Sequence, residues 1–152
     1  MRRARRRVPV ARGAAPSGPD VLVLGADDPA RDWLCGLLLG FGFVVLQLSD
    51  SAEALARSAA SHFVAIFVSA SAEATDSDSG IDLCRRIRNA TLRRGAGETV
   101  LVLVADQMQP ADRVRADLVG CDDVILKPVT RGSVARLLDA RGIALPSDAR
   151  GT

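Results

Sequence analysis

The feature that most constrains the fold is a regular alternation of short apolar runs with segments of helical periodicity. The apolar runs are residues 21–24, 43–48, 63–68, 99–104 and 124–126. The segments with helical spacing are residues 29–39, 51–60, 81–89, 110–119 and 133–141. Nearly continuous apolar runs are typical of strands buried on both faces, and strands alternating with helices indicate a parallel sheet. We therefore predict a doubly wound α/β domain with helices on both faces of the sheet.

The two ends of the chain differ from this pattern. Residues 1–19 carry six arginines and no acidic residue, so they form a basic arm that we expect to be disordered. Without these arginines, the 20 basic side chains fall to 14, against 18 acidic ones. The predicted domain at residues 20–142 is therefore mildly acidic, and residues 143–152 form a C-terminal tail.

Composition excludes several classes of protein. The longest apolar run, residues 37–46, contains two glycines and is too short to span a bilayer, so we expect no membrane span. The spacing of Cys35, Cys84 and Cys121 suits neither a zinc site nor a redox pair. We expect the cysteines to be small core residues, reduced in the cytoplasm, because no export signal is evident.

Functional residues in an open α/β sheet lie at the carboxyl ends of the strands. Residues 25–28 lack the glycine spacing and lysine of a phosphate-binding loop, and Ser69 has no evident base. We therefore expect no enzymatic activity. Lys127 stands out, because it is the one lysine among 20 basic residues and follows the last strand. It is either an ammonium directed into the crevice at the strand ends or a chance surface residue.

Several short sequence segments, in their order along the chain, resemble segments of the receiver domains of response regulators. They are residues 21–24, Asp28-Pro29-Ala30-Arg31, Gly42-Phe43, residues 50–55, residues 80–88, Gly120-Cys121-Asp122-Asp123 and Lys127-Pro128. The resemblance covers residues 20–141. It implies the flavodoxin-like (CheY-like) fold, with five parallel strands in the order 2-1-3-4-5, and a role in two-component signalling or a phosphorelay.

The resemblance also implies where the family's site residues would fall. The acidic pair that binds Mg²⁺ falls on Gly25 and Ala26, with Asp27 and Asp28 adjacent, and a shift of one residue would bring Asp27 into the pair. The phosphoacceptor position falls on Ser69.

Of the remaining positions of the family's site, two are substituted and two match the family. The Ser/Thr position falls on Ala105 and the switch aromatic on Val124. Lys127 and Pro128 match the family.

These departures predict a degenerate receiver. Mg²⁺ requires oxygen ligands, chiefly carboxylates, so we expect its binding to be lost, unless Asp27 or Asp28 retains a weak interaction. A serine hydroxyl without a base does not replace the acceptor carboxylate. Asp76 and Asp78 lie in the polar loop after the third strand, where nothing positions them for the reaction.

We therefore expect a stand-alone adaptor that binds a histidine kinase, a phosphotransfer protein or another regulator. In the first helix, Trp33 is predicted to face the core, whereas Cys35 and Leu39 face outward as a candidate interface, for a partner or a homodimer. The face formed by residues 110–119, 124–126 and 133–141 is a second candidate. The alternative function is a nucleic-acid-associated protein that binds through the arginine arm and dimerises through the α/β domain. The arm could equally contact an anionic membrane surface, be a solubilising tail, or reflect an upstream start of translation.

Overall fold

The computed structural model describes residues 5–7, 20–25, 29–69, 78–94 and 99–146. Five parallel strands form the body of the sheet: β2 (Asp20–Gly25), β3 (Val44–Leu48), β4 (Ala65–Ser69), β5 (Val100–Ala105) and β6 (Asp123–Leu126). They lie in the order β3-β2-β4-β5-β6. This is the predicted order 2-1-3-4-5, so the predicted doubly wound fold is confirmed.

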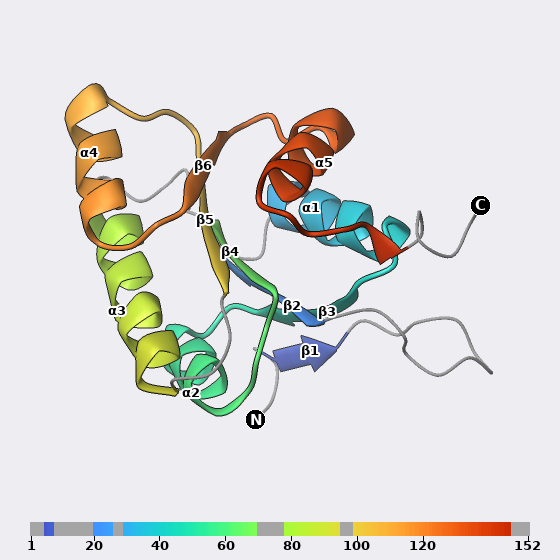
Figure 1. The fold of residues 1–152 in the computed structure, drawn as a ribbon, viewed down its shortest axis with the longest axis horizontal. Helices are drawn as coiled ribbons and strands as arrows, with labels where there is room; N and C mark the ends of the chain where they lie inside the picture. Colours follow the sequence, from blue (N-terminus) through green and yellow to red (C-terminus); the bar gives the residue numbers. More distant parts are fainter. Residues whose placement is uncertain (1–4, 8–19, 26–28, 70–77, 95–98, 147–152) are drawn as a thin grey trace.

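Helices cover both faces of this sheet (Figure 1). On one face lie α1 (Pro29–Gly40) and α5 (Arg131–Ala140), and on the other lie α2 (Ser51–Ala60), α3 (Asp78–Arg94) and α4 (Pro110–Leu118). Local sequence determines where the helices begin. The Asp50 side chain accepts from the Ala52 amide at 3.0 Å, and Thr130 and Ser133 form a capping box at the start of α5.

The core consists of two apolar layers separated by the sheet. Successive strand residues point to opposite faces, so Val21 and Val23 pack with α1 and α5, whereas Leu22 and Leu24 pack with α2, α3 and α4. Each fully buried Val or Leu contributes about 1.5–3 kcal/mol of transfer free energy, so the two layers account for much of the stability of the fold.

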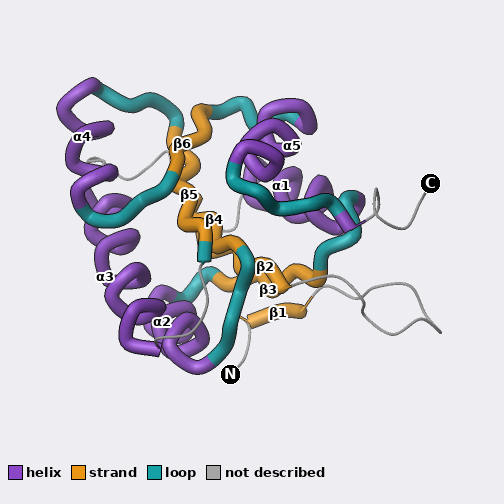
Figure 2. The backbone as a smooth tube through the Cα atoms, in the orientation of Figure 1, coloured by secondary structure: helices purple, strands orange, loops and turns teal. Residues whose placement is uncertain are grey.

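A sixth strand corrects the prediction for the N-terminal arm. β1 (Arg5–Arg7) pairs antiparallel with β3 and places Arg5 opposite Leu48 and Arg7 opposite Leu46 (Figure 2). The expectation that residues 1–19 are disordered is wrong for these three residues, and the rest of the arm lies outside the described residues. The physical reason is that β3 would otherwise be an edge strand with unpaired backbone groups, which an extended segment can pair.

The orientation of α1 is a second correction. Cys35, predicted to face outward, is 4% exposed, and Leu39 is partly buried against the core. Trp33, predicted to face inward, is 55% exposed. The buried stripe includes Arg31, Leu34, Cys35 and Leu38, the i, i+3, i+4, i+7 pattern of a helix face. The prediction failed because it excluded the charged Arg31 from the buried face and assigned the large Trp33 to it.

The bounds of two segments also differ from expectation. α3 is longer than the predicted residues 81–89 at both ends. After α5, the Ile143 amide donates to the Leu138 carbonyl at 2.8 Å, and Ile143 and Leu145 pack on the core. The domain therefore continues through Leu145 rather than ending at residue 142. No helix of the described segments is both long enough and apolar enough to span a membrane.

Candidate functional site

The carboxyl ends of the parallel strands bring the predicted site residues together. Gly25 ends β2 and lies opposite Ser69, which ends β4. Ser69 lies in register with Val104, the residue before Ala105. Ala105 ends β5, and its carbonyl accepts from the Lys127 amide at 2.9 Å. Residues far apart in the sequence therefore meet at one edge of the sheet, as the fold class requires.

Gly25 and Ser69 approach each other unusually closely. A Cβ atom at Gly25 would lie 2.8 Å from the Ser69 Cβ and 3.1 Å from the Ser69 carbonyl oxygen. Both neighbouring atoms belong to the backbone or are bonded directly to it, so they cannot swing away as the end of a long side chain can. The absence of a side chain at position 25 is therefore a packing requirement of these two strands.

The other substituted positions are buried or half-buried. Ser69 is 7% exposed and Ala105 is 4% exposed, so both are buried, and Ala105 has no hydroxyl. Val124 is half-buried and packs on the core layer beside α2, α3 and α4. The side chains of Ala105 and Val124 therefore contribute to packing.

Lys127 pairs with a residue that the sequence analysis did not assign to the site. Its Nζ lies 3.6 Å from Oδ1 of Asp106, the residue that follows β5. The Lys127 side chain is 13% exposed, whereas that of Asp106 is 47% exposed. The ammonium is therefore held within the protein surface by a carboxylate that remains in contact with water. The sequence places Asp106 directly after a predicted strand, and therefore at this edge, but it gave no indication of the contact with Lys127.

A second cation lies near the end of β2. Arg31, buried in the first turn of α1, donates from Nη1 to the Gly25 carbonyl at 3.0 Å. Its Nη2 lies 3.6 Å from Asp32 Oδ1, which also accepts from Gln47 Nε2 at 3.0 Å. Sequence reasoning missed this arrangement, because a buried arginine is uncommon and no sequence pattern marks it.

Asp106 supplies a carboxylate among the described residues at this edge, and it lies beside the Lys127 ammonium. Gly25 carries no side chain, Ser69 carries a hydroxyl, and Lys127 carries a positive charge. Within the described segments, no group of three His, Cys, Asp or Glu side chains could hold a metal ion. Ala26, Asp27 and Asp28 lie outside the described residues.

An apolar groove opens beside Lys127. It has a volume of about 440 Å³ and is lined by the start of α1 and by the segment that joins β6 to α5. Trp33 forms one wall, and its indole N–H donates to the Val129 carbonyl at 2.7 Å. The lining residues are Pro29, Ala30, Trp33, Lys127, Pro128, Val129, Thr130 and Arg131. The exposed surface of α1 is therefore centred on Trp33 and not on Cys35 or Leu39.

No family model matches the sequence, and no curated protein matches it. Solved structures, in contrast, match this chain. The chain is similar to the chemotaxis protein CheY4 of Vibrio cholerae, with a TM-score of 0.68, 18% identity, and coverage of 82% of this chain and 98% of that one. The structure has the receiver fold.

Two further solved structures share the receiver fold. A two-component response regulator from Clostridium difficile has a TM-score of 0.66 and 21% identity, with 80% of this chain and 93% of that one covered. The receiver domain of a sensor histidine kinase from Pseudomonas aeruginosa has a TM-score of 0.65 and 19% identity, with 82% and 97% covered. That structure has a magnesium ion coordinated in its active-site cleft.

Proposed function

We propose that this protein is a receiver-like module of two-component signalling that binds another signalling protein without being phosphorylated itself. The contact between Gly25 and Ser69 is the observation that carries the proposal. Ser69 carries a hydroxyl at the position where we expect the acceptor from the resemblance, and the contact leaves no space for a side chain at Gly25 on the neighbouring strand. Lys127, which would contact phosphoryl oxygens in the family, is instead beside Asp106.

The chemistry of phosphoryl transfer supports the same conclusion. The negative charge that develops during transfer requires positioned cations, and in receivers the metal supplies most of that charge. Without carboxylates at Gly25 and Ser69, a divalent ion would have few oxygen ligands beside Lys127. A serine hydroxyl also needs a base to become a nucleophile. We infer that this edge of the sheet neither binds Mg²⁺ nor accepts a phosphoryl group.

Incubation of the full chain with acetyl phosphate and Mg²⁺ tests this part of the proposal. A receiver with the acceptor aspartate serves as the positive control. We expect the intact mass of the protein to stay unchanged, while the control gains about 80 Da for one phosphoryl group. A gain of that mass that hydroxylamine removes would show an acyl phosphate and overturn the proposal.

The single tryptophan gives an independent readout of the same edge. Trp33 lines the groove that contains Lys127, and its indole is hydrogen-bonded to Val129. Binding of Mg²⁺ or beryllofluoride beside Lys127 would change the surroundings of the indole and therefore its fluorescence. We expect no saturable change on titration with either. A saturable change with Mg²⁺ would contradict the proposed loss of the metal site.

The groove beside Lys127 is the surface that we propose for the signalling partner, a histidine kinase, a phosphotransfer protein or another regulator. It combines an exposed aromatic ring with a mostly apolar lining, and aromatic residues are enriched at the centres of protein interfaces. The Lys127 ammonium lies beside Asp106 and the Arg131 guanidinium lies 4.8 Å from the centre of the Phe41 ring, so the groove offers a partner chiefly apolar contacts.

Binding to purified kinase and phosphotransfer domains tests the surface. Trp33→Ala should weaken binding at least tenfold, because it removes the largest exposed side chain of the groove. Leu92→Ala is the matched control, since Leu92 is 65% exposed but belongs to α3, on the other face of the sheet. An equal loss of affinity in both variants would contradict the proposal that the groove binds the partner.

A further inference from the structure

The two outer strands among the five parallel ones differ in how they are protected. β6 forms one side of this parallel sheet and β3 the other. An outer strand presents backbone N–H and C=O groups that can pair with a strand of another chain. Proteins prevent such pairing with charged side chains, with proline, with a short strand, or by covering the edge. The first three devices are found at β6 and the last at β3.

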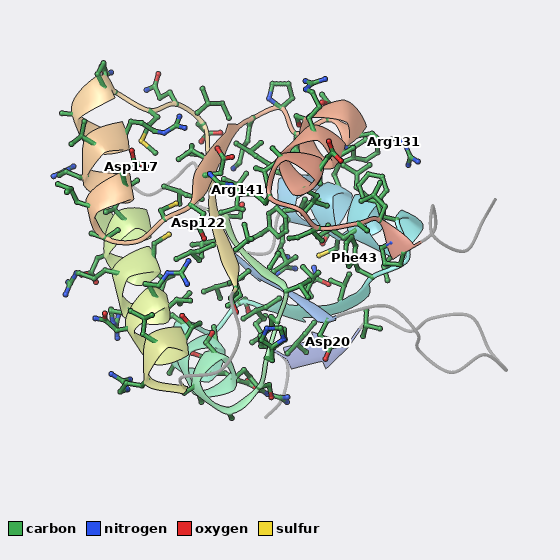
Figure 3. All side chains as sticks on the ribbon, in the orientation of Figure 1. Asp20, Phe43, Asp117, Asp122, Arg131 and Arg141 are labelled. Atoms are coloured by element: carbon green, nitrogen blue, oxygen red, sulfur yellow. The ribbon has the colours of Figure 1, made fainter. Side chains whose placement is uncertain are left out.

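The β6 edge is protected by its own residues. Asp123 begins this four-residue strand, and its carboxylate oxygens lie 3.7 Å from Arg113 Nη2 and 3.6 Å from Arg141 Nη2. Figure 3 shows Arg141 close to Asp122, the residue before the strand, whose carbonyl accepts a hydrogen bond from it. Pro128 lies just beyond the strand, and proline has no N–H to offer to a neighbouring strand. Charge, short length and proline therefore all oppose pairing at this edge.

The residues of β3 provide none of these devices. Val44–Leu48 contains four aliphatic residues and one glutamine, with no charged residue and no proline. All five residues are buried. An outer strand of this composition is the kind of segment that pairs with copies of itself. The protection of this edge therefore has to come from another part of the chain.

β1 supplies that protection. Its backbone pairs antiparallel with residues 46–48 of β3, and β1 thereby becomes the outermost strand of the sheet. All three residues of β1 are arginines. If β1 of two copies paired antiparallel, arginines would lie opposite arginines, and like charges in opposite positions destabilise a strand pair. The arm thus replaces an apolar edge with one that disfavours pairing with its own copy.

We propose that β1 is a strap that keeps this chain monomeric, and that the β3 edge beneath it is a docking site for β3 of a second copy. With β1 removed, the two β3 strands pair antiparallel about a two-fold axis at Leu46. Val44 then lies opposite the partner's Leu48, and Val45 lies opposite the partner's Gln47. Apolar residues meet across most of this pair, and one surface serves both copies, as a two-fold dimer requires.

The strap prevails over a second copy because it belongs to the same chain. Residues 8–19 join β1 to β2, and a tethered segment acts at an effective concentration of about 1 mM. A second copy at a much lower concentration does not displace it. Without the tethered strap this advantage is lost, and a second β3 can pair with all five residues, whereas β1 covers three.

Measurement of the mass in solution by sedimentation tests the strap. The full chain should stay at 16.0 kDa as the protein concentration is raised. The chain without residues 1–19 should shift toward twice its own mass over the same range. The described core layers begin at Val21, so this deletion leaves them intact. Deletion of residues 1–4 is the matched control, and that chain should stay monomeric because it keeps β1.

Substitutions in the full chain separate strand pairing from charge. Arg5→Pro, Arg6→Pro and Arg7→Pro together remove the N–H groups of β1 and should give the same dimer as the deletion. Arg5→Lys, Arg6→Lys and Arg7→Lys together keep the N–H groups and the charge, so this variant should stay monomeric. A synthetic peptide of residues 1–12, added to the chain without residues 1–19, should return it to the mass of one protomer.

Hydrogen exchange locates the contact in the truncated chain. At low concentration this chain is monomeric, and a peptide that contains β3 should exchange quickly. Its exchange should slow as the mass doubles, because the β3 amides regain partners. A peptide from α4 should not change, although Val114 and Leu118 of α4 are 58% and 79% exposed. Leu118→Glu should likewise leave the dimer of the truncated chain unchanged.

Three results would overturn the proposal. The first is a truncated chain that keeps the mass of one protomer at every concentration. The second is a full chain that dimerises as readily as the truncated one. The third is loss of the dimer with Leu118→Glu, which would place the contact on α4. None of these results bears on the acetyl phosphate experiment, which probes the crevice at the carboxyl ends of the strands.

Discussion

Gly25 and Ser69 are packed so tightly that a Cβ atom at position 25 would lie 2.8 Å from the Ser69 Cβ. A side chain at position 25 is therefore excluded by sterics. An aspartate at position 25 would require β2 and β4 to move apart. Gly25 and Ser69 are thus two parts of one packing arrangement.

The first prediction follows from this contact. Gly25→Ala should lower the free energy of unfolding by about 1–3 kcal/mol, the usual cost of adding a methyl group to a packed site. Gly36→Ala is the matched control, because nothing lies within 4 Å of a Cβ at this exposed position of α1. That variant should raise the free energy of unfolding by about 0.5–1 kcal/mol, the difference in helix propensity between glycine and alanine. Urea denaturation measures both.

A second substitution tests whether Ser69 is the cause. Ser69→Gly removes the Cβ atom that the new methyl group meets, so the double variant should recover part of the loss caused by Gly25→Ala. In a double-mutant cycle, the two changes should therefore be non-additive. Additive effects would show that the cost at Gly25 arises elsewhere.

The second prediction concerns the turn that leads into β6. Asp122 Oδ2 accepts from Arg88 Nη2 at 2.7 Å and from the Leu101 amide at 2.8 Å. Asp122→Asn should lower the free energy of unfolding by about 1–3 kcal/mol, because it weakens two charge-assisted hydrogen bonds between elements that are distant in sequence. Thermal or urea unfolding of the variant and the wild type measures this change in the free energy of unfolding.

Asp82→Asn is the control for this prediction. Asp82 pairs with Arg85 and Arg86 on the surface of α3, and its side chain is 45% exposed. Exposed pairs of this kind contribute about 0–1 kcal/mol, so this variant should stay within about 0.5 kcal/mol of the wild type. An equal loss in both variants would mean that the Asp122 network is no stronger than a surface pair.

The sequence predicted the fold because strand and helix periodicities repeat without interruption. Apolar runs such as residues 99–104 have few alternatives to a buried strand, and the β-α alternation then determines a parallel sheet. The ends of the strands follow from the same pattern, so Gly25, Ser69, Ala105 and Lys127 were correctly brought to one edge.

Other features could not be predicted because they depend on contacts between distant segments. Which face of α1 is buried depends on the burial of Arg31. The Arg31 guanidinium donates to the Gly25 carbonyl, and this hydrogen bond forms only in the folded chain. The hydrogen bond of Arg88 with the Gly120 carbonyl follows from the packing of α3 against the turn after α4, so the spacing of these residues in the sequence did not indicate it.

The third prediction concerns Gly120, where backbone and packing both require glycine. Its φ is +100°, which side-chain-bearing residues rarely adopt, and a Cβ atom there would meet Arg88. Gly120→Ala should therefore lower the free energy of unfolding by more than Gly142→Ala, because Gly142 has a φ of +79° but open space around it. The difference between the two variants in urea, about 1–3 kcal/mol, reports chiefly the packing contribution at Gly120. Equal losses would show that backbone strain accounts for both.

The last prediction tests β1. Arg5–Arg7 pairs with residues 46–48 and covers the outer edge of β3, so deletion of residues 1–19 should expose backbone amides on that side. Hydrogen exchange of a peptide that contains β3 should become faster, because those amides lose their partners and open to solvent. A peptide from β4 should keep its protection, since β4 pairs with β2 and β5 and not with β1. Unchanged exchange in β3 would mean that the strand pairing contributes nothing in solution, and the arm would then be free for the electrostatic binding of nucleic acid, which salt would weaken steeply.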